Sequence, residues 1–346
     1  MNMDAIIRKI PKIDLHCHLA GAVRATTVMS LAAGNGVALP ITDPDAFYRF
    51  TDFYDFLSRL ETIGKCIITR DDFARIAYEA MEDGYRQGNL RYAEFFFSPD
   101  YHYPHGVRYT TIVDGLIDGL RAAETELGVV GRLIPAINRE LGPEAAMTMV
   151  RDVVANPRAE VIGIGMDCAE CKGPPELFHD AYALARASGL RCTAHACEDN
   201  QTLEQAPPQN VMTCLDVLGC DRIDHGYNLL ADPELVCRCR ERGVAFTVCP
   251  QTCVPERLEK RWTSLKAMAQ AGLSMVPCTD DPAMFATDIG TAYVTMARVL
   301  SLDVHAVADL SLQTIDATWL PDVEKDALRN DFRQQIRSLI GLRDDH

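Results

Sequence analysis

The stretch "IDLHCHLAG", residues 13–21, places two histidines two residues apart at the end of a short apolar run and just before a glycine. Successive side chains of a β-strand point to opposite faces, so His16 and His18 share one face while Cys17 points to the other. A single histidine in such a run is more often a core residue, whereas two on one face can bind the same metal ion. The spacing therefore predicts a strand that ends at a metal site.

Short apolar runs recur along the whole chain and alternate with segments of helical periodicity. This alternation predicts parallel strands joined by crossover helices. Counting the first run, we expect about eight strands, near residues 12, 90, 130, 160, 190, 221, 244 and 273. Eight such strands favour an α/β fold of the (β/α)8 barrel type, with residues 1–346 forming one domain.

Two segments lie outside this repeat. Residues 34–68 form a long helical insertion after the first strand, and residues 300–346 are expected to form C-terminal helices. The insertion carries the aromatic-rich "FYRFTDFYDFL", residues 47–57. Two interpretations remain open for it: a helix pair that packs the aromatic rings on its own core, or an apolar lid over a ligand mouth.

The outer helix expected over residues 69–88 has clear end signals. Thr69 and Asp72 form the pattern of a capping pair, and Gly88 stands at the expected stop. One stripe of the helix is apolar and is expected to face the barrel: Phe73, Ile76, Ala77, Ala80 and Met81.

The overall charge excludes one class of partner. The chain has 49 acidic against 34 basic residues and a formal net charge of −15, so a phosphate backbone would be repelled and no nucleic-acid partner is expected.

No uncharged apolar window of about 18 residues occurs, and the N-terminal apolar stretch is too short for a signal peptide. We therefore expect a cytoplasmic protein with no membrane partner. The oligomeric state is left open.

Thirteen cysteines are an odd number in a chain too large to need disulfide bonds for stability. Most are expected to be reduced and buried. A rival metal hypothesis is a structural zinc site on thiolates, with three close pairs as candidates: Cys168 and Cys171, Cys237 and Cys239, Cys249 and Cys253. Such sites usually need two pairs on tight turns, whereas the second pair lies in a helical pattern, so this hypothesis is disfavoured.

Later strands also end in polar residues that bind metals or move protons. His195 lies in "TAHACED" (193–199), His225 in "RIDHGYN" (222–228), and Asp280 and Asp281 in "PCTDDPAMF" (277–285). The carboxyl ends of all barrel strands meet at one face, so these side chains and the two histidines of the first strand are expected to meet there. Each motif alone is weak, but together and in order they predict one catalytic site.

Four motifs resemble the adenosine deaminase family, the purine branch of the amidohydrolase-type barrels: "DLHCHLAG" (14–21), "HACED" (195–199), "DRIDHGYN" (221–228) and "CTDDPAMF" (278–285). The segment "DLSLQTIDATWLPDVEKDAL" (309–328) also resembles the closing helices of that family. The resemblance implies that one zinc ion is held by His16, His18, His195 and Asp280, with water completing the site. Iron also suits these ligands.

The resemblance implies hydrolytic removal of the 6-amino group of a small-molecule purine with release of ammonia, adenosine being the default substrate. A zinc ion makes water a nucleophile at neutral pH by lowering its pKa toward about 7. His225 can take the proton of that water. Glu198, kept neutral by burial, can protonate the ring nitrogen beside the attacked carbon. By the same resemblance Asp281 faces the N7 edge of the purine.

Several positions depart from the family pattern. Ala20 stands where adenosine deaminases carry an acidic residue that holds the ribose. "GMDCAECKGPP" (165–175) lacks the glycine of the nucleoside-specific members, brings Glu170 close and resembles the adenine deaminase branch. Glu170 is expected either to bind the substrate or to cap a surface turn. Cys197 replaces a family glycine, which would narrow the pocket or bend the loop, and "CPQTCV" (249–254) matches neither branch. These departures leave adenine and N6-substituted adenine as alternatives to adenosine.

Two other classes of function remain open. A two-metal hydrolase would need a bridging lysine at the end of the fourth strand, but that strand ends in Met166 and Asp167, and Lys172 lies beyond it. A barrel that keeps its metal only to bind a ligand would not need both Glu198 and His225. The signature of the small zinc deaminases that act on nucleic acids is absent.

Overall fold

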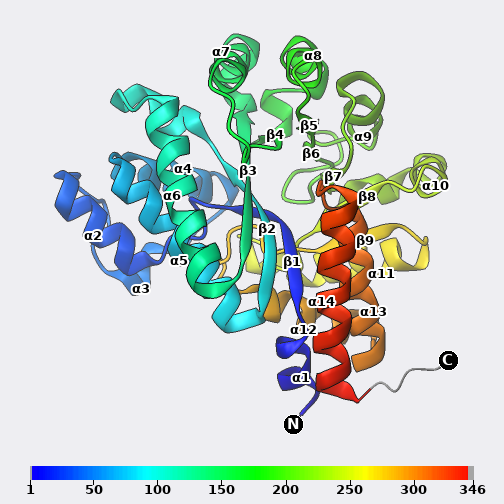
Figure 1. Cartoon of the computed structure of the whole chain (residues 1–346). Helices are drawn as coiled ribbons and strands as arrows, with labels where there is room; N and C mark the ends of the chain where they lie inside the picture. The colour runs from blue at the N-terminus through cyan, green and yellow to red at the C-terminus, as the bar shows by residue number, and fades with distance from the viewer. Residues whose placement is uncertain (1, 342–346) are drawn as a thin grey trace.

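The computed structural model describes residues 2–341 and shows a closed barrel of parallel strands ringed by helices (Figure 1). The first four strands are β1 (Lys12–His18), β2 (Leu90–Phe97), β3 (Val130–Asn138) and β4 (Gly163–Asp167). The remaining segments are β5 (Arg191–Cys192), β6 (His195–Ala196), β7 (Ile223–His225), β8 (Ala245–Val248) and β9 (Ser274–Pro277). β5 and β6 together occupy the place of the fifth predicted strand, which is interrupted at Thr193 and Ala194.

Hydrogen bonds between neighbouring strands run right round the barrel. β1 to β5 and β6 to β9 form two parallel sheets, and the sheets meet where Thr193 N donates to Ile164 O at 3.1 Å. The barrel closes between its last and first strands, because His18 N donates to Asp280 O and Asp280 N donates to His16 O, both at 2.8 Å. The predicted (β/α)8 barrel is therefore confirmed.

The helices that follow the strands form the outer ring. They are α5 (Arg70–Gly88), α6 (Tyr109–Leu127), α7 (Gly142–Ala155), α8 (His179–Ala187), α9 (Gln209–Thr213), α10 (Pro233–Glu241), α11 (Leu258–Gln270) and α12 (Ile289–Leu300). The insertion after β1 contains α2 (Ala25–Asn35), α3 (Pro44–Phe47) and α4 (Phe53–Cys66). Among residues 2–341, no helix combines the length and the apolar character needed to cross a membrane.

Three further helices pack together at the end of the barrel where β1 begins (Figure 1). They are α1 (Met3–Lys9), α13 (Val304–Thr314) and α14 (Asp322–Ile340). The last two are the C-terminal helices expected from the sequence, and residues 342–346 of that prediction lie outside the described residues.

The end signals of α5 are confirmed with one refinement. Thr69 accepts from Asp72 N, and the Asp72 carboxylate accepts from Thr69 N, which makes a complete capping box. The left-handed residue that ends the helix is Asn89, with φ 56°, rather than Gly88. Gly88 is required for another reason, since a Cβ there would lie 2.4 Å from Gly290 N on α12. All five residues of the predicted apolar stripe are buried.

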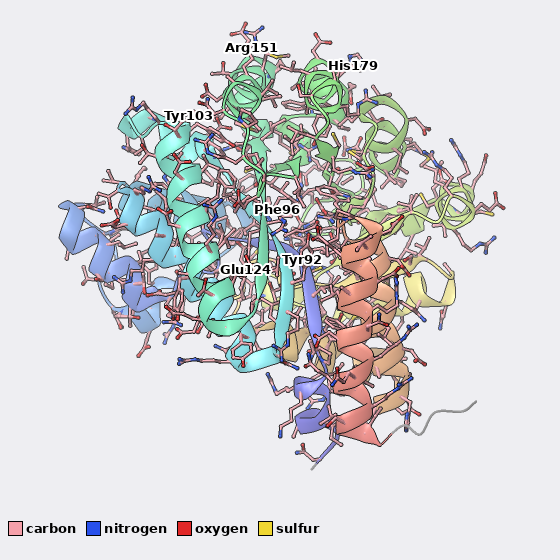
Figure 2. The ribbon with its side chains drawn as sticks, in the orientation of Figure 1. Tyr92, Phe96, Tyr103, Glu124, Arg151 and His179 are labelled. Atoms are coloured by element: carbon pink, nitrogen blue, oxygen red, sulfur yellow. The ribbon has the colours of Figure 1, made fainter. Side chains whose placement is uncertain are left out.

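A buried ion pair links the strands inside the barrel. Glu94 lies on β2 between Tyr92 and Phe96, both labelled in Figure 2, and it pairs with Arg222, which precedes β7. The Arg222 guanidinium also lies 4.0 Å from the ring of Trp319 and donates to a backbone carbonyl of β1. Because neither charge reaches solvent, each depends on the other and on these polar contacts.

Replacing Glu94 with alanine should lower the free energy of unfolding by about 3–5 kcal/mol, because the Arg222 guanidinium would stay buried without its counter-charge. Urea denaturation followed by circular dichroism measures the loss. The control is Arg298→Ala, which removes one partner of the exposed Arg298–Asp4 pair and should cost less than about 1 kcal/mol. Equal losses in the two variants would contradict the structural role of the buried pair.

Candidate active site

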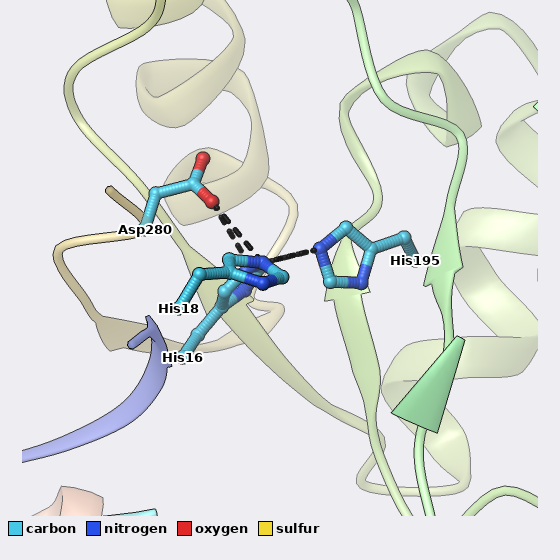
Figure 3. A group of neighbouring side chains, drawn as sticks. All are labelled: His16, His18, His195 and Asp280. Atoms are coloured by element: carbon cyan, nitrogen blue, oxygen red, sulfur yellow. Dashed lines mark hydrogen bonds and ion pairs between the residues drawn. The ribbon is translucent and has the colours of Figure 1, made fainter. Parts of the chain in front are cut away.

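Four predicted metal ligands meet at the carboxyl ends of the strands (Figure 3). His195 Nε2 lies 3.1 Å from His16 Nε2 and 3.1 Å from His18 Nε2. Asp280 Oδ1 lies 3.3 Å from His16 Nε2 and 3.6 Å from His18 Nε2. Metal bonds of about 2.0–2.1 Å in a tetrahedron place ligand atoms about 3.3 Å apart, so this donor set fits a divalent metal ion.

Polar contacts with the buried Asp224 carboxylate lie behind two of the imidazole ligands. Thr247 Oγ1 donates to Asp224 Oδ1 at 2.7 Å, and it lies 3.0 Å from His16 Nδ1. Since the hydroxyl proton is given to Asp224, His16 Nδ1 must donate, which leaves Nε2 free to bind a metal. His195 Nδ1 likewise lies 3.4 Å from Asp224 Oδ2. One buried carboxylate therefore orients two ligands.

Strained backbone marks the strand ends that carry the site. Four residues there have a left-handed conformation that non-glycine residues rarely adopt: Cys168 (φ 70°), Cys197 (φ 59°), His225 (φ 72°) and Asp280 (φ 65°). At Cys197, where the family has glycine, the side chain turns away from the site and Sγ donates to Pro207 O at 3.1 Å. Cys197 is therefore not among the residues that line the cavity.

A cavity opens directly above the metal ligands. It encloses roughly 550 Å³ of non-protein space, part of which is open to solvent. Its floor includes His18, His195 and Asp280, and Ala20 lies in its wall. The outer wall is apolar and comes largely from α4 of the insertion: Phe53, Phe56, Leu57 and Leu60. The aromatic segment thus contributes to the mouth of the cavity as well as to the core.

Glu198 and His225 face the same cavity and can exchange protons with a ligand there. Burial raises the pKa of the Glu198 carboxyl to about 8, although the nearby Arg261 guanidinium opposes the shift. Burial also lowers the pKa of His225 well below its usual value. His225 Nε2 lies 3.8 Å from Glu198 Oε1. At neutral pH the site therefore offers a neutral acid beside a neutral base.

Asp281 also lines the cavity, and its position depends on a glycine. A Cβ on Gly21 would lie 1.8 Å from Asp281 Oδ1, so only glycine leaves room for this carboxyl. Burial and the neighbouring Asp280 both raise the pKa of Asp281. Its buried Oδ1 makes no hydrogen bond to any described residue. A carboxyl left unpaired at a cavity is suited to bind a polar ligand.

Glu170 lies behind the cavity wall instead of facing the cavity. The carboxylate is 1% exposed and accepts from Cys197 N at 3.0 Å, Glu198 N at 3.1 Å and Asn210 Nδ2 at 2.9 Å. Neither the substrate contact nor the surface cap expected for Glu170 describes this arrangement. In the structure Glu170 holds the backbone that carries Glu198.

Sequence analysis did not identify Asn200 and Arg261. Asn200 lines the cavity and donates to the Glu198 carboxyl. Arg261, on α11, is fully buried, donates to Asp199 Oδ1 at 2.8 Å and has Nη2 3.7 Å from Glu198 Oε1. An arginine in a helical pattern normally lies at the surface, so no local signal indicated this one.

The alternative metal arrangements have little support. All thirteen cysteines are free thiols. Within residues 2–341, only one other group of possible ligands comes together, and it adds His225 and Cys249 to the shared His16 and Asp280. Lys172 cannot bridge two metals at the site, because its Nζ pairs with Glu140 at the surface at 2.5 Å.

Comparison with known proteins agrees with this geometry. The family model described as "Adenosine deaminase" matches residues 11–335. The chain is 36% identical over 321 residues to an adenine deaminase of Streptomyces coelicolor, which covers 91% of this chain and 92% of the relative.

Two solved structures have the same fold over nearly their whole length. An amidohydrolase from Burkholderia ambifaria with bound zinc is 36% identical with a TM-score of 0.89, covering 98% of this chain and 93% of that one. The adenine deaminase of Arthrobacter aurescens is 30% identical with a TM-score of 0.86, covering 94% of this chain and 99% of that one.

Replacing Asp280 with alanine should reduce the affinity for zinc by more than about 100-fold, because it removes one of four converging donors. Metal analysis of the purified chain after dialysis measures the loss. Asp281→Asn is the control, since this neighbour is not among the converging ligands, and it should retain its metal. Retention by Asp280→Ala together with loss by Asp281→Asn would contradict the ligand assignment.

Proposed function

Because the chain belongs to the adenosine deaminase family, we propose that it is a zinc-dependent hydrolase that removes the 6-amino group of a purine, with adenine as its preferred substrate. One observation carries the proposal: three of the four converging metal ligands, the neutral acid Glu198, the neutral base His225 and the unpaired Asp281 all face one cavity. A barrel that only bound a ligand would not need this combination of acid and base.

We assign one zinc ion per chain to His16, His18, His195 and Asp280. Three imidazole nitrogens and a carboxylate oxygen form a donor set that suits zinc, and iron could use the same set. A similar solved structure contains zinc. When bound, zinc supplies a water molecule whose pKa is lowered toward about 7, and therefore a nucleophile at neutral pH.

The side chains of the site would move the protons of the reaction. Glu198, neutral before the reaction, would donate its proton to the ring nitrogen beside the amino-bearing carbon, which makes that carbon easier to attack. His225 would accept a proton from the attacking water. Asp281 would hydrogen-bond the opposite edge of the purine. His225 would return its proton to the departing amino group, which leaves as ammonia, and Glu198 would take up the proton of the added hydroxyl as the carbonyl forms.

The walls of the cavity favour a free base over a nucleoside. Ala20 offers no carboxylate to the hydroxyl groups of a ribose, and the aromatic wall supplied by α4 is apolar. The curated relative and the Arthrobacter aurescens structure are both named for adenine. Adenosine, the default expected from the sequence, is therefore not our preferred substrate. The cytoplasm is the proposed location, as expected from composition.

Zinc-loaded wild type should hydrolyse adenine faster than adenosine or N6-methyladenine, with release of ammonia from the first two compounds and of methylamine from the third. Loss of absorbance near the adenine maximum, run in parallel on the three compounds, measures the rates. Glu198→Gln should lower kcat for adenine by about 10²–10⁴-fold while keeping its zinc, because the amide cannot supply the proton. Absence of turnover of all three compounds would overturn the purine assignment.

The rate should also fall as the pH rises through about 8. Glu198 acts as an acid, so kcat/KM is expected to decrease once its carboxyl, with its pKa raised to about 8 by burial, loses its proton. Steady-state measurements of kcat/KM on adenine from pH 6 to pH 10 test whether the value falls in this direction. The residual activity of Glu198→Gln should lack this alkaline decline. A decline that persists in the variant would assign it to another group.

A further inference from the structure

Two stretches that depart from the family pattern meet beside the catalytic acid. Asn200 follows "HACED", and Thr252 lies in "CPQTCV". Thr252 Oγ1 donates to Asn200 Oδ1 at 2.8 Å, and Asn200 Nδ2 donates to Glu198 Oε1. Thr252 is buried, while Asn200 lies in the cavity wall. The three side chains form a continuous chain of hydrogen bonds that ends at the acid.

In the structure these hydrogen bonds all run toward the acid. Thr252 Oγ1 donates to Asn200 Oδ1 at 2.8 Å and accepts from Val254 N at 3.5 Å. With its oxygen accepting from Thr252, the Asn200 amide turns its NH₂ group toward Glu198. Glu198 Oε1 is therefore an acceptor, and a neutral Glu198 carries its proton on Oε2.

Other groups around the acid favour the same assignment. Arg261 Nη2 lies 3.7 Å from Glu198 Oε1, and His225 Nε2 lies 3.8 Å from the same oxygen. The Arg261 guanidinium is held in place by Asp199, with which it forms a buried pair. The nitrogens near the carboxyl therefore gather at one oxygen, which leaves the other for the ligand.

We propose that Asn200, oriented by Thr252, is a positioning residue that fixes the proton of Glu198 on Oε2, from which it is given to the purine ring nitrogen. This inference rests on the proposed function, because it concerns how the same acid delivers its proton. Asn200 acts through Glu198 and makes no contribution of its own to purine binding. It follows that its loss should reduce kcat and leave KM nearly unchanged.

Three single variants of the zinc-loaded protein test this series of hydrogen bonds, with kcat on adenine as the quantity measured. Asn200→Ala should lower kcat by about 10–100-fold, the range typical of groups that orient a functional residue. Thr252→Val should lower kcat by about 3–10-fold, since the amide can then rotate. Thr252→Ser keeps the hydroxyl and should stay within about twofold of wild type.

The double variant separates this role from a merely structural one. Thr252→Val should add almost nothing in the background of Asn200→Ala, because Thr252 acts only through Asn200. Independent losses that multiply in the double variant would overturn the proposal. So would an equal loss of kcat in Thr252→Ser and Thr252→Val.

Binding of 1-deazaadenine, which lacks the ring nitrogen that receives the proton, supplies a readout without catalysis. Its inhibition constant should be the same for wild type and Asn200→Ala, and a loss of affinity in the variant would instead indicate direct contact with the purine. If wild type is active on adenine and Asn200→Ala has the same kcat, the positioning role is overturned but the proposed function is not. Wild type that is inactive on adenine would overturn the proposed function and this role with it.

Discussion

Closure of the barrel and assembly of the metal site depend on the same residues. The backbone of Asp280 pairs with the backbones of His16 and His18, and the side chains of the same three residues converge as ligands. Strand pairing therefore sets the distances between three of the four donors before any metal binds. Only His195 must be brought from the opposite side of the barrel. The ligand geometry is thus a consequence of the fold and needs no flexible loop to complete it.

Burial gives the groups around the metal ligands their chemical character. Glu198 stays neutral at neutral pH because it is removed from water, and His225 stays neutral for the same reason. Charged groups buried beside them are paired with each other, as Arg261 is with Asp199. Left-handed backbone at His225 and Asp280 directs these two side chains into the site at a conformational cost. The site therefore combines a rigid backbone frame with a carboxyl and an imidazole whose pKa values are shifted by burial.

The features that sequence analysis predicted correctly follow from local patterns. Alternation along a strand placed His16 and His18 on one face, and the capping pair located the start of α5. Roles that it did not foresee depend on partners distant in the chain: Glu170 binds a backbone 27 residues away, and Arg261 pairs with a carboxylate 62 residues away. Two roles were expected for Glu170, substrate binding or capping of a surface turn, because its position near the fourth strand end did not reveal which way the side chain turns.

X-ray absorption spectroscopy at the zinc edge, on the zinc-loaded chain, tests the metal site most directly. The structure predicts nitrogen and oxygen neighbours at about 2.0–2.1 Å, with imidazole scattering and no sulfur. The alternative ligand group contains Cys249. A sulfur neighbour at about 2.3 Å would place the ion on that cysteine and would contradict the assignment to His16, His18, His195 and Asp280.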